Sequence, residues 1–284
     1  MIAITGATGQ LGRLTIASLL TKIAPSQILA LARDPAKASD LSAQGVIVRK
    51  ADYDDQASLD AALQGVDKVL LISSNEIGKR DRQHAAVIDA ARKNNVGFIA
   101  YTSLLHADTS TLELRKEHLQ TEAALRQSGM PHAILRNGWY TENQTANLAG
   151  AVAHSAIIGN SGDGKFSAAA RADYAEAAAV VLATDGHNGR IYELAGDTAY
   201  TRAEFAAELA QISGKPIVYR NMTEEEHRQA LLGFGLPAEL AGVISESDTG
   251  AAQGALFDGS RQLSTLIGRP STPWQETLRQ ALAG

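Results

Sequence analysis

Three glycines near the start of the chain are spaced so that their backbone could hold phosphate groups. They stand in the run Gly6-Ala7-Thr8-Gly9-Gln10-Leu11-Gly12, between an apolar segment and an amphipathic one. Glycines at this spacing let a strand turn tightly into a helix, and they let the backbone approach a pyrophosphate. The exposed amides and the positive end of the helix dipole then bind the phosphates. A glycine-rich turn without a ligand is the alternative, but such a run rarely falls by chance between a strand and a helix. The run therefore predicts a dinucleotide site.

The residue that ends the next apolar segment indicates which dinucleotide is bound. NAD sites carry an acidic residue about 20 residues past the glycines, where it bonds the ribose 2′-OH. Here the segment 27–32 ends in Arg33, and a guanidinium suits a 2′-phosphate. Asp34 could hold the ribose instead, with Arg33 a solvated loop residue, but Asp34-Pro35 also has the form of a helix start. The sequence favours NADPH, and Lys37 could add to the same basic site.

The elements that must position these residues follow the pattern of a parallel sheet covered by helices. Strands are expected at 2–5, 27–32, 46–49, 69–72, 98–102 and 132–136. Helices are expected at 10–21, from Asp34-Pro35 onward, and at 58–63, 82–93 and 113–127. The regularity weakens after Gly138. There the sequence predicts an alanine-rich helix at 172–184 capped by Asp173 or its neighbour, a strand at 190–194 and a helix that begins with the capping box Thr201–Glu204. Several short helices follow residue 223.

The expected fold is α/β, a Rossmann-type doubly wound parallel sheet with a smaller C-terminal α/β lobe. Residues 1–150 form the NADP-binding core, with contributions from about 172–195, and residues 151–284 form mainly the smaller substrate-binding lobe. A chain of 284 residues is long for one sheet-and-helix unit and short for two independent domains.

Composition excludes several classes of function. A formal net charge of −5 with scattered basic residues argues against nucleic acid as a partner. The chain has no cysteine, which excludes disulfides and thiolate chemistry, and it has no metal-ligand spacing. No apolar run approaches the roughly 20 residues needed to span a bilayer, and the first residues lack signal-peptide features. We therefore expect a cytoplasmic protein without membrane insertion. A homo-oligomer is compatible with the sequence.

Four segments together resemble the NmrA-like branch of the short-chain dehydrogenase/reductase superfamily. They are the run GATGQLG, the step Arg33-Asp34-Pro35, the triplet Asp52-Tyr53-Asp54, and GMPHAILRNGWYTEN at 129–143. Within the branch, the chain is most similar to the bacterial NAD(P)H-dependent quinone oxidoreductases. The resemblance covers nearly the whole chain, most firmly 1–180. Its most specific part is 128–143.

The resemblance implies an active-site cleft between the core and the C-terminal lobe, and a set of residues that bind NADPH. Those in the glycine run and at the end of the second strand are Gly6, Ala7, Thr8, Gly9, Gln10, Leu11 and Arg33. Those in the loops after the fourth and sixth strands are Ser73, Ser74 and Asn75, and Asn137, Gly138, Trp139, Tyr140, Thr141 and Glu142. The second of these loops runs to Asn143 and would line the nicotinamide. Asp52 would lie near the adenine edge, or be only a polar residue that ends a strand. Arg171 precedes the alanine-rich helix, where it could reach a cofactor phosphate or the ring amide, or be a surface charge.

The catalytic pair of ordinary short-chain dehydrogenases is missing. They use a Tyr-x-x-x-Lys pair to exchange a proton with an alcohol or carbonyl, but none of the seven tyrosines here has a lysine four residues on. When the chain is aligned on the segment 125–131, His118 occupies the position of the lysine of that pair, and Leu114 occupies the position of the tyrosine. A ketone needs a strong proton donor, whereas a quinone accepts hydride to give a delocalised phenolate. The absence therefore fits quinone reduction, or no catalysis.

The remaining catalytic candidates are polar groups expected near the nicotinamide. Asn143 could donate a hydrogen bond to a quinone oxygen, and Tyr140 could stack on the ring or donate its hydroxyl. Trp139 could wall the pocket. His118 could supply a proton near neutral pH, or lie on a solvated helix face beside charged neighbours.

We therefore predict an NADPH-dependent reductase that transfers hydride directly to a quinone or similar small acceptor, without flavin or metal. The main alternative is a non-catalytic NADP-binding redox sensor of the NmrA type. A sugar-nucleotide epimerase should keep Tyr-x-x-x-Lys and is disfavoured.

Overall fold

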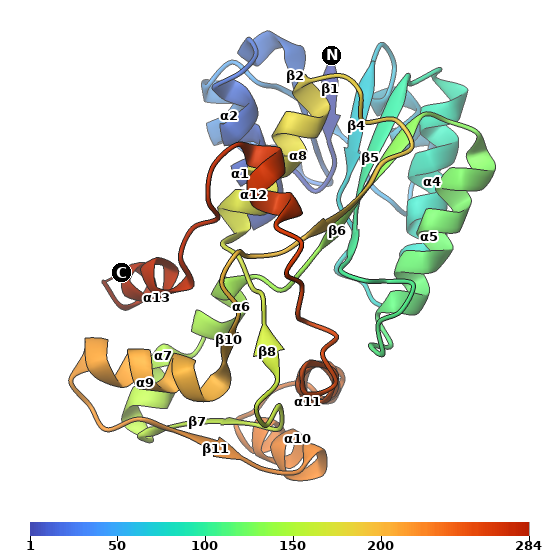
Figure 1. Cartoon of the computed structure of the whole chain (residues 1–284). Coiled ribbons are helices and arrows are strands. Elements are labelled where there is room, and N and C mark those ends of the chain that lie inside the picture. The colour runs from blue at the N-terminus through green and yellow to red at the C-terminus, as the bar shows by residue number, and fades with distance from the viewer. Residues whose placement is uncertain (284) are drawn as a thin grey trace.

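The computed structural model describes residues 1–283 and is built on a seven-stranded parallel sheet (Figure 1). Its strand order is β3-β2-β1-β4-β5-β6-β9, and every neighbouring pair runs parallel. The strands are β1 (Ile2–Ile4), β2 (Ile28–Ala32), β3 (Ile47–Lys50), β4 (Lys68–Leu71), β5 (Phe98–Leu104), β6 (His132–Asn137) and β9 (Ile191–Leu194). The chain reverses its direction across the sheet between β1 and β4. Ligands of doubly wound sheets bind at the carboxyl ends of the strands beside such a reversal.

Helices cover both faces of the sheet because alternate strand residues are buried on opposite sides. On one face, Ile4 and Leu70 pack against α1 (Gln10–Leu20), α8 (Arg171–Ala183) and α12 (Gln262–Ile267). On the other, Ala3 and Leu71 pack against α3 (Gln56–Ala62), α4 (Arg80–Lys93) and α5 (Arg115–Ser128). Strands buried on both faces read as continuous apolar runs, which is how the sequence showed them. The Rossmann-type fold is confirmed.

The chain leaves the sheet after β6 and builds a second group of elements below it (Figure 1). Two small sheets pair β8 (Lys165–Phe166) with β10 (Tyr200–Thr201) and β7 (Ala156–Gly159) with β11 (Val218–Asn221). The helices here are α6 (Thr141–Thr145), α7 (Leu148–Ala153), α9 (Arg202–Ser213), α10 (Glu224–Gly233), α11 (Ala238–Ala252) and α13 (Trp274–Ala283). Aromatic rings fill the core of this group, with Tyr200 and Trp274 centred 4.4 Å apart. The domain boundary at residue 150 remains a prediction.

Several local expectations are corrected. The helix that Asp34-Pro35 opens is a 3₁₀ turn, η2 (Pro35–Ala38), followed by the short α2 (Ser39–Ala43), and a second 3₁₀ turn is η1 (Pro25–Gln27). Asp34 does cap η2, since its carboxylate accepts from the Ala36 amide at 3.1 Å. The cap expected at Asp173 is wrong. Asp173 is fully buried and accepts from Arg269 and the Thr272 amide, both at 2.7 Å, while the N-cap residue of α8 is Ala170, whose side chain cannot accept a hydrogen bond.

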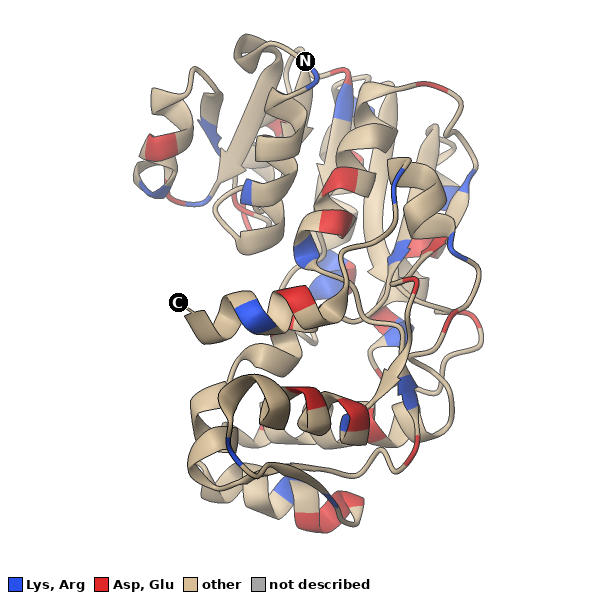
Figure 2. Cartoon of the chain, turned by 60° about the vertical axis from the view of Figure 1, so that its left-hand side comes forward, with Lys and Arg blue, Asp and Glu red and all other residues tan. Residues whose placement is uncertain are grey.

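Charged residues of both signs are distributed over the whole molecule. Lys and Arg lie among Asp and Glu in the upper and lower parts of the chain (Figure 2). Within the described part of the chain, every helix is too short or too polar to cross a bilayer.

Candidate active site

The glycine run forms the turn between β1 and α1. Gly6 has a φ of +57°, in the left-handed region that favours glycine, and its carbonyl accepts from the Gly9 amide at 2.9 Å. A Cβ added at Gly12 would lie 2.4 Å from the Gly6 oxygen and 2.8 Å from the Cα of Ala7. Since real Cβ contacts are longer, only glycine lets the helix approach the strand this closely. Gly12 therefore sets the close packing of α1 against β1.

The N-terminus of α1 is open to a negatively charged ligand. Gly9 is its N-cap and provides no side-chain acceptor, and the first turn contains no acidic residue. Gly6, Gly9 and Gln10 are exposed. Among residues 1–283, the first amides of the helix therefore have no capping partner, as a pyrophosphate site requires.

Arg33 projects from the end of β2 at the same edge of the sheet. Its side chain is 66 % exposed, and its guanidinium lies 3.4 Å from the Glu76 carboxylate in the loop after β4. Asp34 is occupied by its capping bond. Arg33 is thus available to an incoming phosphate, whereas Asp34 already has a structural task.

Arg13 supports this corner, and nothing in the sequence marked it. It donates to the Thr8 carbonyl at 3.2 Å and to the Lys37 carbonyl at 2.6 Å, and it pairs with Asp40. The contact holds η2 against the glycine loop. The Asp40 pKa is lowered by the hydrogen bond from Arg13.

The Asp52 side chain is used within its own turn. Its carboxylate accepts from the Asp54 amide at 3.1 Å, and its backbone amide donates to the Ser58 hydroxyl at 2.9 Å. These contacts favour the structural alternative for Asp52 over an adenine contact.

The loop after β6 contains a buried polar atom without a partner. Asn137 is 6 % exposed, and among the described residues nothing hydrogen-bonds to its side-chain oxygen. The next residue, Gly138, donates to the Leu194 carbonyl at 2.8 Å, and a Cβ there would lie 3.0 Å from the Tyr174 hydroxyl. Close packing thus fixes the backbone beside the Asn137 oxygen. An unpaired buried acceptor requires a donor from a ligand or water.

Arg171 joins this loop to the glycine run. Its guanidinium donates to Gln10 and, at 3.2 Å, to the Asn143 side-chain oxygen, and it lies 4.6 Å from the centre of the Tyr140 ring. Its backbone amide donates to the Glu142 carboxylate at 2.9 and 3.0 Å. Arg171 is therefore not an isolated surface charge. It ties together two loops whose sequence positions are far apart.

The aromatic residues of the loop contact Tyr174 of α8. Tyr140 packs edge-on against Tyr174 with ring centres 5.3 Å apart, and burial raises its pKa. The Tyr174 hydroxyl donates to the Trp139 carbonyl at 3.3 Å. Trp139 and Tyr140 are half-buried, and Thr141 is fully buried.

His118 lies away from these residues, between α5 and β5. It is 5 % exposed, so its placement on a solvated helix face is wrong. Its Nδ1 lies 2.8 Å from the Tyr101 hydroxyl, and burial with the nearby Arg80 charge lowers its pKa to about 3. A neutral, enclosed imidazole cannot act as an acid near neutral pH. The expectation that His118 supplies a proton is therefore corrected.

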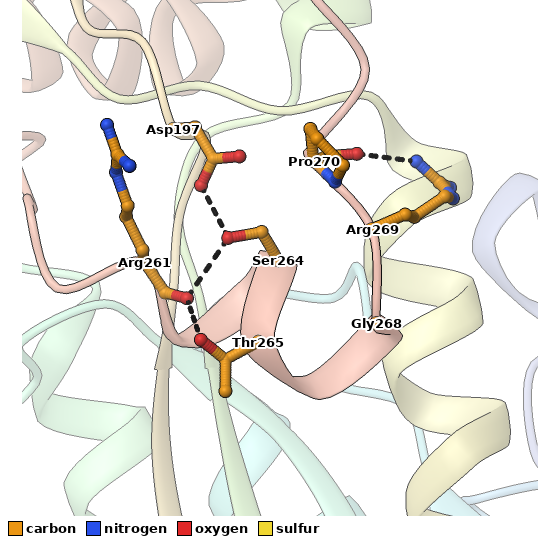
Figure 3. A pocket seen from close by; sticks show the side chains of 7 residues that line it. All are labelled: Asp197, Arg261, Ser264, Thr265, Gly268, Arg269 and Pro270. Carbon is orange, nitrogen blue, oxygen red and sulfur yellow. Dashed lines mark hydrogen bonds between the residues drawn. The ribbon is translucent and has the colours of Figure 1, made fainter.

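A separate cavity of about 400 Å³ lies beside α12 (Figure 3). Asp197 and Arg269, two of the charged residues that line it, are bonded to neighbouring groups of the chain. Asp197 accepts from Ser264 at 2.7 Å and from the Ser271 amide at 2.9 Å, and Arg269 pairs with Asp173 and Glu176 of α8. None of its lining residues belongs to the cofactor set. Residues 1–283 contain no cluster of His, Asp and Glu that could hold a metal ion.

Comparison with known proteins agrees with this geometry. A profile of an NAD(P)H-binding family matches residues 6–185. Quinone oxidoreductase 2 of Escherichia coli strain K12 is 54 % identical over 278 residues, which cover 98 % of this chain and 97 % of that protein. The chain belongs to this NAD(P)H-binding family.

Solved structures of the family superpose closely. The NADPH complex of the quinone oxidoreductase from Escherichia coli matches with a TM-score of 0.97, covering 99 % of this chain and 100 % of that one. The triphenylmethane reductase of Citrobacter sp. with NADP(H) is 38 % identical and matches with a TM-score of 0.95 over 99 % and 100 % of the two chains. The resemblance inferred from the sequence is confirmed.

The residues present fit NADPH. Gly12 leaves no room for a side chain, and the N-cap residue of α1 provides no side-chain acceptor. Arg33 is 66 % exposed with Glu76 as its ion-pair partner, and the Asn137 oxygen is a buried acceptor without a donor among the described residues. These features lie after β1, β2 and β6, at the carboxyl edge of the sheet.

Proposed function

We propose that this protein is an NADPH-dependent reductase that passes hydride directly to a quinone or a similar small acceptor, without flavin or metal. The observation that carries the proposal is the contact of Arg171 with both Gln10 and Asn143, which joins the phosphate-binding turn to the loop expected at the nicotinamide. The activity of the Escherichia coli relative supports the acceptor class.

The chain would hold the cofactor at three points. The amides of 6–11 would bind the pyrophosphate, and Arg33 would bind the 2′-phosphate through charge-assisted bonds. The loop at 73–75 and the loop at 137–143 would flank the nicotinamide, with the Asn137 oxygen available to the carboxamide N–H. Bound NADPH supplies the hydride.

Asn143 would orient the acceptor. Because Arg171 can only donate, the atom of Asn143 that faces it is the oxygen, and the amide nitrogen is left for another partner. Asn143 is exposed, so that nitrogen can meet a ligand. A donor held in place before the reaction stabilises the negative charge that develops on a quinone oxygen.

The site lacks a strong acid, which restricts the acceptor. His118 is buried and neutral, and Tyr140 has a raised pKa and holds its proton tightly. A hydroquinone anion is stable enough to take its proton from solvent or a weak donor, whereas an alkoxide is not. The groups present therefore support quinone reduction better than ketone reduction.

The mode of transfer is tested with NADPH deuterated at both C4 positions, mixed in single turnovers with flavin-free protein and excess 1,4-benzoquinone. We expect a normal primary isotope effect on NADPH oxidation and one hydroquinone per NADPH. Binding of NADPH without oxidation would instead support the sensor alternative. A bound flavin that is reduced before the quinone would contradict direct transfer.

We further propose that the protein acts in the cytoplasm and has no nucleic-acid partner. The net charge of −5 and the interspersed charges in Figure 2 support the second point. Light scattering after size-exclusion chromatography determines whether it forms a homo-oligomer.

A further inference from the structure

The loop after β4 is held by side chains of neighbouring elements. Ser74 is 7 % exposed, and both of its backbone groups are bonded by α4. Its N–H donates to Nε2 of His84 at 2.9 Å, and its carbonyl accepts from Nε of Arg80 at 2.6 Å. The preceding amide, of Ser73, donates to the Thr102 hydroxyl of β5 at 2.9 Å. This irregular segment is therefore tied to its surroundings at consecutive residues.

The bond to His84 has a fixed direction. A backbone N–H can only donate, so Nε2 accepts and the proton of the ring resides on Nδ1. That Nδ1–H donates to the Thr121 hydroxyl at 2.8 Å, and the hydroxyl donates to the Glu117 carbonyl at 3.0 Å. Backbone groups thus fix both ends of the chain of hydrogen bonds. His84 must be neutral within it, in agreement with a pKa lowered to about 3 by burial and by the Arg80 charge.

Arg80 is held in place by side chains of α5. Its Nη1 lies 3.4 Å from Nε2 of His118, whose Nδ1 contacts the Tyr101 hydroxyl. It also lies 3.9 Å from the Glu117 carboxylate, which accepts from the Gly78 amide at 2.8 Å. His118, at the position where ordinary short-chain dehydrogenases carry the catalytic lysine, here packs against the arginine that binds the loop.

We propose that His84 and Arg80 are positioning residues of the cofactor site, which hold the loop at 73–75 in place through both backbone groups of Ser74. The proposal rests on the proposed function in one respect, the placement of this loop against NADPH. Neither residue would touch the cofactor. A loop that is already rigid loses less conformational entropy when the ligand binds. These two bonds to Ser74, here called the clamp, should therefore raise the affinity for NADPH. A purely structural role would affect folding without a selective effect on NADPH.

The test compares His84→Leu with His84→Gln. Leucine leaves the buried Ser74 N–H unpaired, whereas the glutamine oxygen can accept it and the glutamine nitrogen can donate toward Thr121. We expect His84→Leu to raise both the Kd and the KM for NADPH about tenfold, because the loop leaves its place to hydrate the unpaired Ser74 N–H and must be ordered again when NADPH binds. The quinone KM should not change, and His84→Gln should restore most of the affinity.

His227→Leu is the matched control. His227 is also buried, at 2 % exposure, and its Nδ1 lies 2.6 Å from the Asn160 side-chain oxygen in the lower part of the molecule. It should lose thermal stability and keep the NADPH Kd. An unchanged Kd in His84→Leu, or equal losses in the leucine and glutamine variants, would overturn the proposal.

Amide hydrogen exchange of the wild-type protein keeps the proposal testable if His84→Leu does not fold. The Ser74 amide should be strongly protected although it lies outside helices and strands, and exchange at the rate of an open loop would overturn the clamp. The Kd measurement needs no quinone. Wild-type protein that binds NADPH but reduces no quinone would refute the proposed function and leave the clamp testable.

Discussion

The Arg171→Met variant tests how the acceptor site is organised. Methionine keeps most of the length and apolar surface of arginine but cannot donate to Asn143 or Gln10. Without the donor, the Asn143 amide is free to rotate and to present either its oxygen or its nitrogen to the acceptor. The donor that we assign to the quinone oxygen is then present only part of the time.

The expected magnitude follows from the exposure of the pair. A hydrogen bond to a charged group contributes about 1.5–3 kcal/mol when it is buried. Arg171 is half-buried and Asn143 is exposed, so solvent screening reduces this to about 1 kcal/mol. That free energy corresponds to a roughly fivefold lower kcat. Asn143→Ala removes the donor itself and should lower kcat by at least as much, up to about a hundredfold.

A double-mutant cycle in steady-state NADPH oxidation measures the coupling. If Arg171 acts through Asn143, adding Arg171→Met to Asn143→Ala causes no further loss of kcat. Fully additive losses would refute the reasoning. If Arg171 instead binds a cofactor phosphate, the variant raises the NADPH Kd equally in both backgrounds and leaves kcat unchanged.

Three further outcomes follow from the structure. Gly12→Ala forces a Cβ to within 2.4 Å of a backbone oxygen, so it should lower the free energy of unfolding by about 1–3 kcal/mol and lower the Tm. The control is Gly242→Ala, in a helix with open space around it, which should leave the Tm equal or higher. Arg33→Met should raise the NADPH KM at least about tenfold and leave the NADH KM unchanged; equal effects on both would remove Arg33 from the 2′-phosphate site. His84 and His118 have pKa values lowered to about 3, so the unfolded protein binds more protons. Neither histidine lowers the free energy of unfolding above about pH 6.5. Between about pH 6.5 and pH 3, each lowers it by up to about 1.4 kcal/mol per pH unit. The Tm of His84→Gln should therefore fall less than that of wild type between pH 7.5 and 5, and an equal fall would contradict the assignment.

The sheet and the glycine turn were predictable because their signals are local. Most strands of the main sheet are short apolar runs, and the glycine spacing is set by one turn between β1 and α1. The strands β8 and β11 left no such signal. β8 has two residues and pairs with a strand more than 30 residues on, and β11 is mostly exposed, so neither carries a clear apolar pattern.

His118 shows why a buried polar face escapes sequence analysis. The side of α5 that faces the sheet carries His118, Thr121, Glu122 and Leu125, and only the last is apolar. Glu122 is fully buried because Arg136 of β6 binds it with two bonds of 2.9 Å. Hydropathy assigns such residues to solvent, since their partners come from strands distant in sequence. The contact between Arg171 and Gln10, 161 residues apart, was invisible for the same reason.

The central claim is most directly tested by steady-state oxidation of NADPH by purified, flavin-free protein with 1,4-benzoquinone, with NADH measured in parallel. We predict rapid turnover with a higher kcat/KM for NADPH than for NADH. Tight NADPH binding with no oxidation across a series of quinones would contradict the claim.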